Sequence, residues 1–477
     1  MTRKKTLKNF SGDDLLSELA ARFAAQHYRP GMTMSQMELA VWDANGMENP
    51  AALRALSALL ARMPLEAPTG KRCPKCARRV PVKAKDHDRE LRTMAGRVTL
   101  KRNYHYCETC QLGFYPVDRT LELPEEGELT AEMEKRVLDF ALTDVYGACA
   151  ARWSVHYRQP ASDNLFRRVV SRVGEQCQAV SQQVLQEELK PALPTTPDAL
   201  VVEMDGSMLP IRGAEPWKEA KVGVIYRHDG ATQKPVPGSA RYVAVVNGLG
   251  EFAPIFEDAL RVERAAELHE VIWLADGAVA NWRLAEHLLP DAIQILDWYH
   301  ALQHAVDCGK ALLGEESPLL PLWYERSAQL LAAGEPADLI NELLACIPQL
   351  SKRNKREGLE ALDGLVRYYR ANEHRMRYAV YRDAGFPIAS GAAESAHRHV
   401  LQVRMKRAGQ HWSMTNARKV AMLRAALRTG GPVGLYDGIQ RARKRSGPSA
   451  HYWRRGHYRY AREGTRERRR CLNAPSN

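Results

Sequence analysis

The sequence predicts a multidomain α+β protein in which a mixed α/β domain is flanked by helical regions. The chain has 477 residues, a length that corresponds to three or four domains rather than one hydrophobic core. Five strand-like segments gather between residues 193 and 303, whereas residues 119–192 and 304–384 show helical periodicity. Two Cys-x-x-Cys pairs mark a further small unit before them. Each segment is taken below in chain order.

Residues 1–65 are expected to form N-terminal helices. Ser11 precedes one run of apolar residues at helical spacing, and Asn49 followed by Pro50 precedes another. Ser and Asn are favoured helix caps, and Pro is favoured at the first helical position. Neither helix carries residues that indicate chemistry.

Residues 66–118 are predicted to be a zinc ribbon. "CPKC" and "CETC" are separated by thirty residues, and the alternating segment "GRVTLKRNYHYC" leads into the second pair. Four thiolates can hold one structural Zn²⁺ in tetrahedral geometry, with no position left open for catalysis. The predicted ligands are Cys73, Cys76, Cys107 and Cys110. The alternative is four ordinary buried cysteines. His105 is expected to face solvent or DNA rather than the metal.

Residues 119–192 are predicted to be a helical DNA-binding region. Its last helix is expected to run through residues 162–189, with Ser162 or Asp163 as its cap. A short helix, a turn and a capped helix with basic residues are compatible with a helix-turn-helix in a major groove, although any small helical bundle has this pattern. The candidate DNA contacts are Arg167, Arg168 and Arg172.

Two aspartates stand out in residues 193–303. Asp205 and Asp276 each end an apolar strand and each precede a glycine. Strand ends in α/β folds are where functional residues gather, although Asp-Gly is also a common turn pair. Glu203 shares a strand face with Asp205, and it is expected either to support the site or to face solvent.

The third acid lies in residues 385–430, after the helical segment 304–384. Glu394 follows a Gly-Ala-Ala turn, and a helix-like segment carries basic residues beyond it. Three carboxylates from two strands and a helix can hold two Mg²⁺ (or Mn²⁺) ions for phosphoryl transfer. Cations beside such a site can bind phosphates, although a solvated basic helix face is the alternative. The candidate contacts here are His397, Arg398, Arg404, Lys406 and Arg407.

The charge of the chain favours a polyanionic partner. The net charge is +13, from 69 basic and 56 acidic residues. Residues 431–477 are predicted to be a basic tail, and between Arg441 and Asn477 twelve basic residues outnumber two acidic ones. Such a tail suits DNA or is a solvated end. We expect no membrane span and no signal peptide. Nine cysteines without a secretion signal indicate a reducing cytoplasm.

Three sequence blocks resemble the catalytic blocks of DDE transposases from bacterial insertion sequences. The blocks are "EMDGSML", "WLADGA" and "IASGAAESAHRHVLQVRMKRAGQHWS". The chain is most similar to the ISKra-type family, which is related to the Mutator superfamily. The "DWYH" block, Asp297 to His300, resembles the Asp-x-x-His signature of Mutator-like enzymes. The resemblance covers roughly residues 70–430.

This resemblance implies an RNase H-like core, with Asp205, Asp276 and Glu394 as catalytic metal ligands. The 118 positions between Asp276 and Glu394 imply that a helical insertion interrupts the core. His300 is implied either to contact DNA or to position a catalytic acid, and a purely structural role is the alternative.

The resemblance also implies the reaction and the partners. The enzyme would bind terminal inverted repeats, free their 3′-OH ends and join them to target DNA, as a homodimer or higher homo-oligomer at the bacterial nucleoid. Two other functions remain open. One is a structure-selective endonuclease or resolvase without strand transfer, and the other is a non-enzymatic zinc-ribbon DNA-binding regulator.

Overall fold

The structure is a computed structural model of the whole chain. It describes residues 71–445, with gaps at 95, 122, 125–126, 158–159, 192–198, 214–215 and 347–354, together with residues 18, 21–22 and 25–26. The predicted N-terminal helices, apart from those few positions, and residues 446–477 of the basic tail lie outside the described residues. Contacts divide the chain into two units, Met1–Glu134 with Ala150–Ala161 and Lys135–Cys149 with Ser162–Asn477. The division into seven segments stays a prediction.

The first unit contains two small antiparallel sheets. Strands β1 (Lys71–Arg72) and β2 (Arg79–Val80) pair across the first Cys-x-x-Cys turn. The second sheet has the order β3 (Val82–Thr93), β4 (Gly96–Cys107) and β5 (Leu112–Phe114), and helix α4 (Pro116–Thr120) follows it. Alternating residues of the β3–β4 hairpin bury Leu91 and Leu100 against Val117, so period-two patterning produces the strand predicted before the second cysteine pair.

Four helices follow the ribbon, where the sequence predicted three. They are α5 (Ala131–Thr143), α6 (Tyr146–Tyr157), α7 (Asp163–Gln178) and α8 (Gln182–Leu189). Ser162 is the N-cap residue of α7, as predicted. The predicted continuous helix over 162–189 is wrong, because the chain turns at Ala179–Ser181 and Ser181 starts α8. Ser at such a position favours a new helix start over continuation.

A mixed six-stranded sheet forms the centre of the second unit. The strands are β6 (Ala199–Pro210), β7 (Trp217–Asp229), β8 (Lys234–Pro235), β9 (Arg241–Val246), β10 (Val271–Ala275) and β11 (Ile293–Leu296). The order is β11-β10-β6-β7, and both β8 and β9 pair with β7. β6, β10 and β11 are parallel, whereas β7 is antiparallel to β6 and β9. The five strand-like segments of the sequence are therefore confirmed as strands.

Helices cover this sheet. Helix α9 (Leu249–Val262), which the sequence analysis did not predict, buries Phe252 and Phe256, and the 3₁₀ turn η2 (Ala265–Glu267) follows it. A β-carbon at Gly223 of β7 would overlap both rings, so glycine allows α9 to approach the strand closely. Helix α10 (Val279–Leu288) connects β10 to the parallel strand β11.

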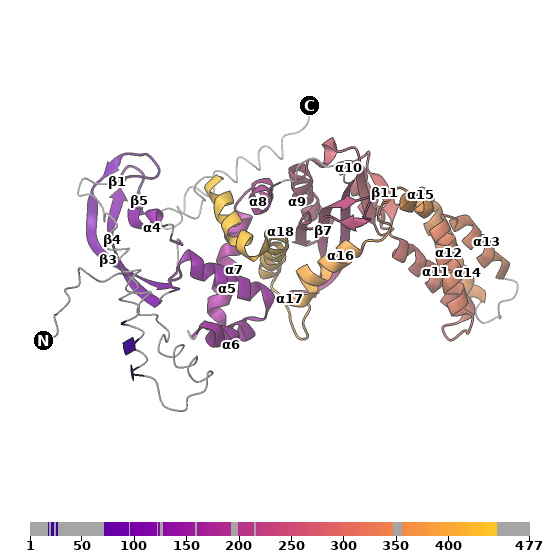
Figure 1. Cartoon of the computed structure of the whole chain (residues 1–477), viewed down its shortest axis with the longest axis horizontal. Coiled ribbons are helices and arrows are strands. Elements are labelled where there is room, and N and C mark those ends of the chain that lie inside the picture. The colour runs from indigo at the N-terminus through magenta and orange to yellow at the C-terminus, as the bar shows by residue number, and fades with distance from the viewer. Residues whose placement is uncertain are drawn as a thin grey trace. The chain divides into compact units, whose positions relative to one another are not determined.

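Residues 298–383 are helical in their described part, where the sequence predicted a helical segment over residues 304–384. Its helices are α11 (Trp298–Leu313), α12 (Leu320–Ala333), α13 (Pro336–Cys346), α14 (Lys355–Asn372), η4 (Glu373–Arg375) and α15 (Tyr378–Asp383). Figure 1 shows α11 to α14 packed as a group, and α11 contacts both α12 and α14. The described part of this region contains no strand.

The chain then returns to the sheet. Helix α16 (Gly391–Ala396) contacts β6 and β7, and it continues into the π-helical turn η5 (His397–Gln402) and α17 (Val403–Met405). Helix α18 (Met414–Arg445) kinks at Gly431, which has φ 71°, and resumes beyond Pro432. The expectation that order ends at residue 430 is wrong, because the second part of α18 buries Leu435 and Ile439.

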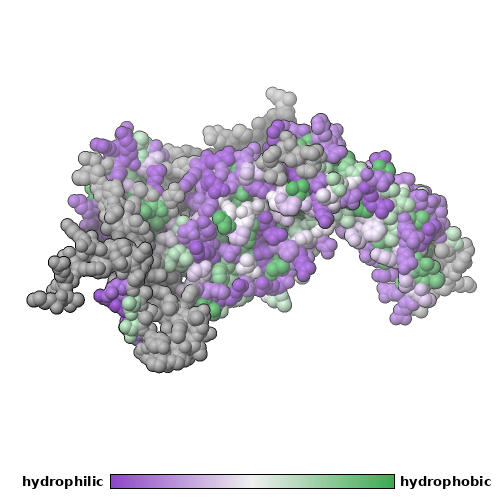
Figure 2. All heavy atoms as spheres, viewed as in Figure 1, coloured by the Kyte–Doolittle hydropathy of each residue, from purple (hydrophilic) through white to green (hydrophobic). Residues whose placement is uncertain are grey.

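No described helix is both long enough and apolar enough to cross a membrane. On the face shown in Figure 2, hydrophobic residues are scattered among hydrophilic ones.

Candidate functional site

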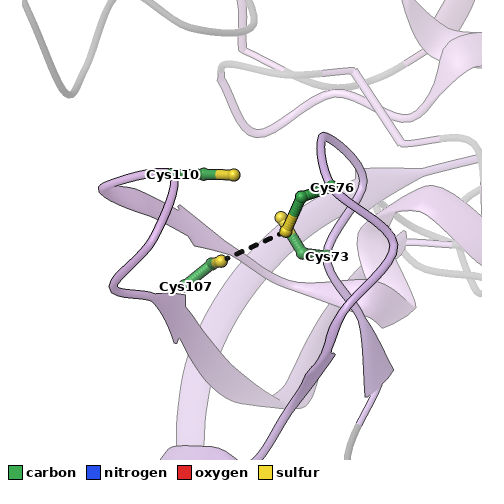
Figure 3. A group of neighbouring side chains, drawn as sticks. All are labelled: Cys73, Cys76, Cys107 and Cys110. Atoms are coloured by element: carbon green, nitrogen blue, oxygen red, sulfur yellow. Dashed lines mark hydrogen bonds between the residues drawn. The ribbon is translucent and has the colours of Figure 1, made fainter.

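The first candidate site is the four-cysteine cluster of the first unit. The side chains of Cys73, Cys76, Cys107 and Cys110 point toward one another from two turns (Figure 3), and their sulfur atoms all lie within 4.8 Å of one another. Each turn ends in a left-handed residue directly after its second cysteine, Ala77 with φ 58° and Gln111 with φ 51°. The amide of Lys75 donates to Cys73 Sγ at 3.4 Å. The two turns are therefore equivalent halves of one site.

The spacing of the sulfur atoms fits zinc. Cys76 Sγ and Cys107 Sγ are 3.7 Å apart, and a tetrahedral site with Zn–S bonds of about 2.3 Å has S–S edges of roughly 3.8 Å. The backbone amide of Arg78 lowers the pKa of the Cys76 thiol to about 7, whereas burial raises the pKa of Cys107 and raises that of Cys110 to about 12. Cys76 is therefore the thiol that most readily forms the thiolate that a metal requires. This cluster can hold zinc, and the described cysteines are all free rather than disulfide-bonded.

His105 is not the exposed residue that the sequence suggested. Its side chain is buried, and its Nδ1 lies 3.0 Å from the carbonyl oxygen of Val80. The ring also stacks on Phe114. It therefore supports the ribbon from inside and does not face solvent or DNA.

The second candidate site is the edge of the central sheet at which the parallel strands end. Leu274 of β10 pairs with Glu203 of β6, and Ala275 pairs with Leu296 of β11. When this register is continued, Asp276 lies beside Asp205 on one side and beside Asp297 on the other. The sequence predicted that β6 ends at Asp205. This is wrong, because β6 continues to Pro210 and pairs with β7 over that length. Asp205 is instead partly exposed, at the point where its parallel neighbour β10 has ended at Ala275.

The turn after β10 fixes Asp276. Its Oδ1 accepts from the amide of Ala278 at 3.1 Å and from Nδ2 of Asn281 at 2.6 Å. A β-carbon at Gly277 would overlap the ring of Tyr368 from α14, so only glycine allows the insertion to approach this turn. Both hydrogen bonds are accepted by Oδ1 of Asp276, so neither of them uses Oδ2.

Glu394 lies on α16. The turn η5, which continues α16, begins with His397, and His397 contacts the same sheet edge. Glu394 is exposed, whereas His397, one turn later, is only 2% exposed. His397 Nε2 lies 3.6 Å from Asp205 Oδ2, so the face that α16 shares with His397 turns toward Asp205. Burial lowers the pKa of His397, and Asp205 opposes this effect. The π-helical turn that starts at His397 is a feature that often occurs at functional sites.

His300 completes this edge. Its Nδ1 lies 3.1 Å from Asp297 Oδ1, and its side chain is 51% exposed. The hydrogen bond with Asp297 raises the pKa of His300, and the charges of Asp276 and Asp205 raise it further. Both predicted catalytic aspartates therefore lie within electrostatic reach of one imidazole.

Two further acids, Glu203 and Asp297, are buried beneath this edge and accept hydrogen bonds. Glu203 is 0% exposed, so the alternative of a solvent-facing Glu203 is wrong. Burial raises its pKa to about 7, and the hydrogen bonds from Tyr226 and Ala393 oppose the rise. Burial also acts to raise the pKa of Asp297, but hydrogen bonds from His300 and Ser390 outweigh it and the pKa is lowered. An acid inside the apolar run "ALVVEM" was the available signal for Glu203, because a buried carboxylate needs partners.

The basic residues near Glu394 divide into exposed and buried groups. Arg398 and Lys406 are exposed. Arg407 is partly exposed and paired with Asp144. Arg404 is 1% exposed, donates to the carbonyl of Ala141 and lies over the Tyr146 and Trp412 rings. The predicted DNA contacts at Arg404 and His397 are therefore wrong for this conformation, because both side chains are used in the interior.

The candidate contacts on α7 also differ in exposure. Arg167 and Arg168 are exposed, whereas Arg172 is half-buried. The opposite face of α7 buries Phe166 and Val173, so the two exposed arginines are the ones that point outward.

The donor set at the sheet edge fits magnesium. Asp205, Asp276 and Glu394 offer carboxylate oxygens, the ligands that Mg²⁺ prefers. Within the described residues, only the cysteine cluster brings three possible ligands within 4.8 Å of one another. A two-ion site does not require such a narrow group, because its ligands spread over ions about 3.5–4 Å apart.

Together these features define a mixed α/β protein with a cluster of four cysteines that can hold a metal ion. Residues 68–438 match the family model described as an uncharacterised protein family, UPF0236, and the chain belongs to this family. No curated protein has a matching sequence. One similar solved chain comes from the "Drosophila P element transposase strand transfer complex", with 11% identity over 66% of this chain and 82% of that chain. Its TM-score of 0.26 is too low to support an argument about fold or function.

Proposed function

We propose that this protein is a DNA transposase that cleaves DNA strands and transfers their 3′-OH ends to target DNA. Two observations carry the proposal: His397, three residues after Glu394, has its Nε2 3.6 Å from Asp205 Oδ2, and the pairing of β10 with β6 leads toward Asp276 and Asp205 on neighbouring strands. His300, whose pKa responds to both aspartates, supports the same grouping. Among transposases, we propose that it belongs to the DDE class and to the ISKra-type family.

The topology supports an RNase H-like core. Three antiparallel strands in sequence order, β6, β7 and β9, are extended on the far side of β6 by the parallel strands β10 and β11. The resulting order is β9-β7-β6-β10-β11, with the first strand at the centre of the sheet. Asp205 on the first strand and Asp276 after the fourth strand then lie on neighbouring strands.

The three acids would hold two Mg²⁺ ions, which supply charge for the scissile phosphate and an activated water or 3′-hydroxyl. Asp205 and Asp276 approach the site from the sheet, and Glu394 approaches it from α16. Asn281 and the Ala278 amide hold Asp276 through one oxygen, so its orientation is set before any ligand arrives. His300 is held by Asp297 and is half-exposed, so it is placed to contact a phosphate.

Exposed basic residues would contact the DNA backbone. Arg398 and Lys406 lie after Glu394, and Arg167 and Arg168 lie on α7. The ribbon adds a further group, since residues 71–85 contain seven Lys or Arg and no Asp or Glu. Phosphate contacts of this kind fix the position of DNA and weaken with salt. Joining two element ends requires at least two copies of the chain, so we infer a homodimer or a higher homo-oligomer.

The test is a strand-transfer assay with Mg²⁺ on DNA that carries the inverted repeats flanking the gene. The proposal predicts that the protein nicks the repeat ends and joins them to target DNA. Hydrolysis without joining would instead favour a structure-selective endonuclease. Binding without metal-dependent cutting would contradict both enzymes and favour a regulator.

A further inference from the structure

The segment that leads into α16 is held by two buried carboxylates. Asp297 Oδ2 accepts from both the amide and the hydroxyl of Ser390. Glu203 Oε2 accepts from the amide of Ala393 at 2.7 Å. A backbone hydrogen bond of 2.9 Å from Trp298 to the carbonyl of Ile388 adds a third link. Residues 388–393 are thus attached immediately before Glu394 at three points: Glu203 of β6, Asp297 after β11 and Trp298 of α11.

These hydrogen bonds matter to the two carboxylates because both carboxylates are buried. Glu203 is 0% exposed and Asp297 is 1% exposed. The second oxygen of Glu203 accepts from Tyr226 Oη at 2.6 Å, and Oδ1 of Asp297 accepts from the His300 amide at 2.8 Å. A buried carboxylate is stable only when hydrogen bonds replace its water. Displacing α16 would leave both carboxylates underpaired, so the low-energy position of the segment is well defined.

Both anchors lie beside strands that lead to the candidate ligands, Glu203 on β6 and Asp297 directly after β11. Glu203 precedes Asp205 by two residues on β6, and strand side chains two apart share a face. Asp297 directly follows β11, the neighbour of the strand that precedes Asp276. The same strands therefore fix the two aspartates and, through Glu203 and Asp297, the helix that carries Glu394.

We propose that Glu203 and Asp297 are positioning residues that set the distance between Glu394 and the two aspartates. This inference rests on the proposed function for its catalytic consequence, but its structural part does not. Neither anchor is assigned to contact DNA or metal. Loss of either anchor would let α16 move away from Asp205 while Asp205, Asp276 and Glu394 all remain present.

The test compares Glu203→Ala with Glu203→Gln. The amide carbonyl of Gln can accept from Ala393 and its NH₂ can donate to Tyr226 Oη, whereas Ala removes both contacts. Amide hydrogen exchange of residues 388–396 should accelerate roughly tenfold to a hundredfold in Glu203→Ala, the loss expected for a hydrogen bond to a charged group, and should return toward wild type in Glu203→Gln. Ser390→Ala, a milder change that removes one bond to Asp297, should accelerate the same peptide less.

Glu263→Ala is the matched control. Glu263 is also buried, at 3% exposure, and it pairs with Arg241 rather than with the α16 segment. It should lower overall stability without selective exchange at 388–396. Unchanged exchange in Glu203→Ala and Ser390→Ala, or the same pattern in Glu263→Ala, would overturn the proposal.

Cleavage kinetics provide the second readout. Where the wild type cuts DNA, Glu203→Ala should lower kcat at least tenfold with little change in KM, and Glu203→Gln should recover most of kcat. Equal kcat in wild type and Glu203→Ala would refute the positioning role. If the wild type does not cut DNA at all, the proposed function fails, and the exchange measurement still decides whether Glu203 holds α16.

Discussion

Replacing any one of the three acids should abolish metal-dependent DNA cleavage without abolishing DNA binding. We expect Asp205→Asn, Asp276→Asn and Glu394→Gln each to lower the cleavage rate by roughly a thousandfold or more. The physical reason is that each substitution removes an anionic ligand, and metal ions contribute several kcal/mol of charge stabilisation in the transition state. Gel-based cleavage kinetics with Mg²⁺, run beside a binding assay on the same DNA, measure both quantities.

Two exposed acids of the insertion provide controls for that series. Glu360 and Asp363 lie on α14, where they pair only with Arg356 and Arg367 of the same helix. Glu360→Gln and Asp363→Asn remove the same kind of charge and should cut at wild-type rates. Cleavage by the Asp205, Asp276 and Glu394 variants at the rate of these controls would show that the sheet edge is not the catalytic site.

Removal of one cysteine of the cluster should unfold the ribbon. We expect Cys107→Ser to reduce bound zinc from about one ion per chain to a small fraction. Structural zinc sites contribute about 10–16 kcal/mol in small domains, far more than the small core of Leu91, Leu100 and Val117 can replace. Elemental analysis gives the zinc content, and limited proteolysis should show new cuts within residues 71–121.

The cysteine prediction has an internal control in the second unit. Cys308 is buried and free but lies outside the four-cysteine cluster. Cys308→Ala should keep its zinc and keep the ribbon resistant to protease. Full zinc content in Cys107→Ser, or an intact ribbon after complete removal of zinc by a chelator, would rule out a structural metal there.

The sequence was most informative where periodicity and chemistry coincided. Apolar runs predicted five of the six strands of the central sheet, all except β8, and paired cysteines predicted the four-thiol cluster. The helical insertion was also predictable, because residues 304–384 lack alternation. These signals are local, so they do not depend on which segments meet in three dimensions.

The missed features depend on tertiary contacts. Arg404 and His397 read as part of a basic helix face, but packing against α5 and β6 buries them. Residues from 431 onward were predicted to be a basic tail, yet α18 continues beyond the kink at Gly431 and buries Tyr436 and its neighbours. Burial of Glu203 depends on the docking of α16, 190 residues away along the chain. No periodicity in a single segment can show which partner will cover it.

The most direct test of the central claim is to map the metal site on the polypeptide itself. Fe²⁺ in place of Mg²⁺, with ascorbate and hydrogen peroxide, generates hydroxyl radicals that cut the backbone nearest to the bound ion. The two-metal site predicts cuts close to residues 205, 276 and 394, all suppressed by excess Mg²⁺ and all lost in Asp205→Asn. Cuts at only one of these positions, or cuts elsewhere that Mg²⁺ does not suppress, would contradict a single site built from the three acids.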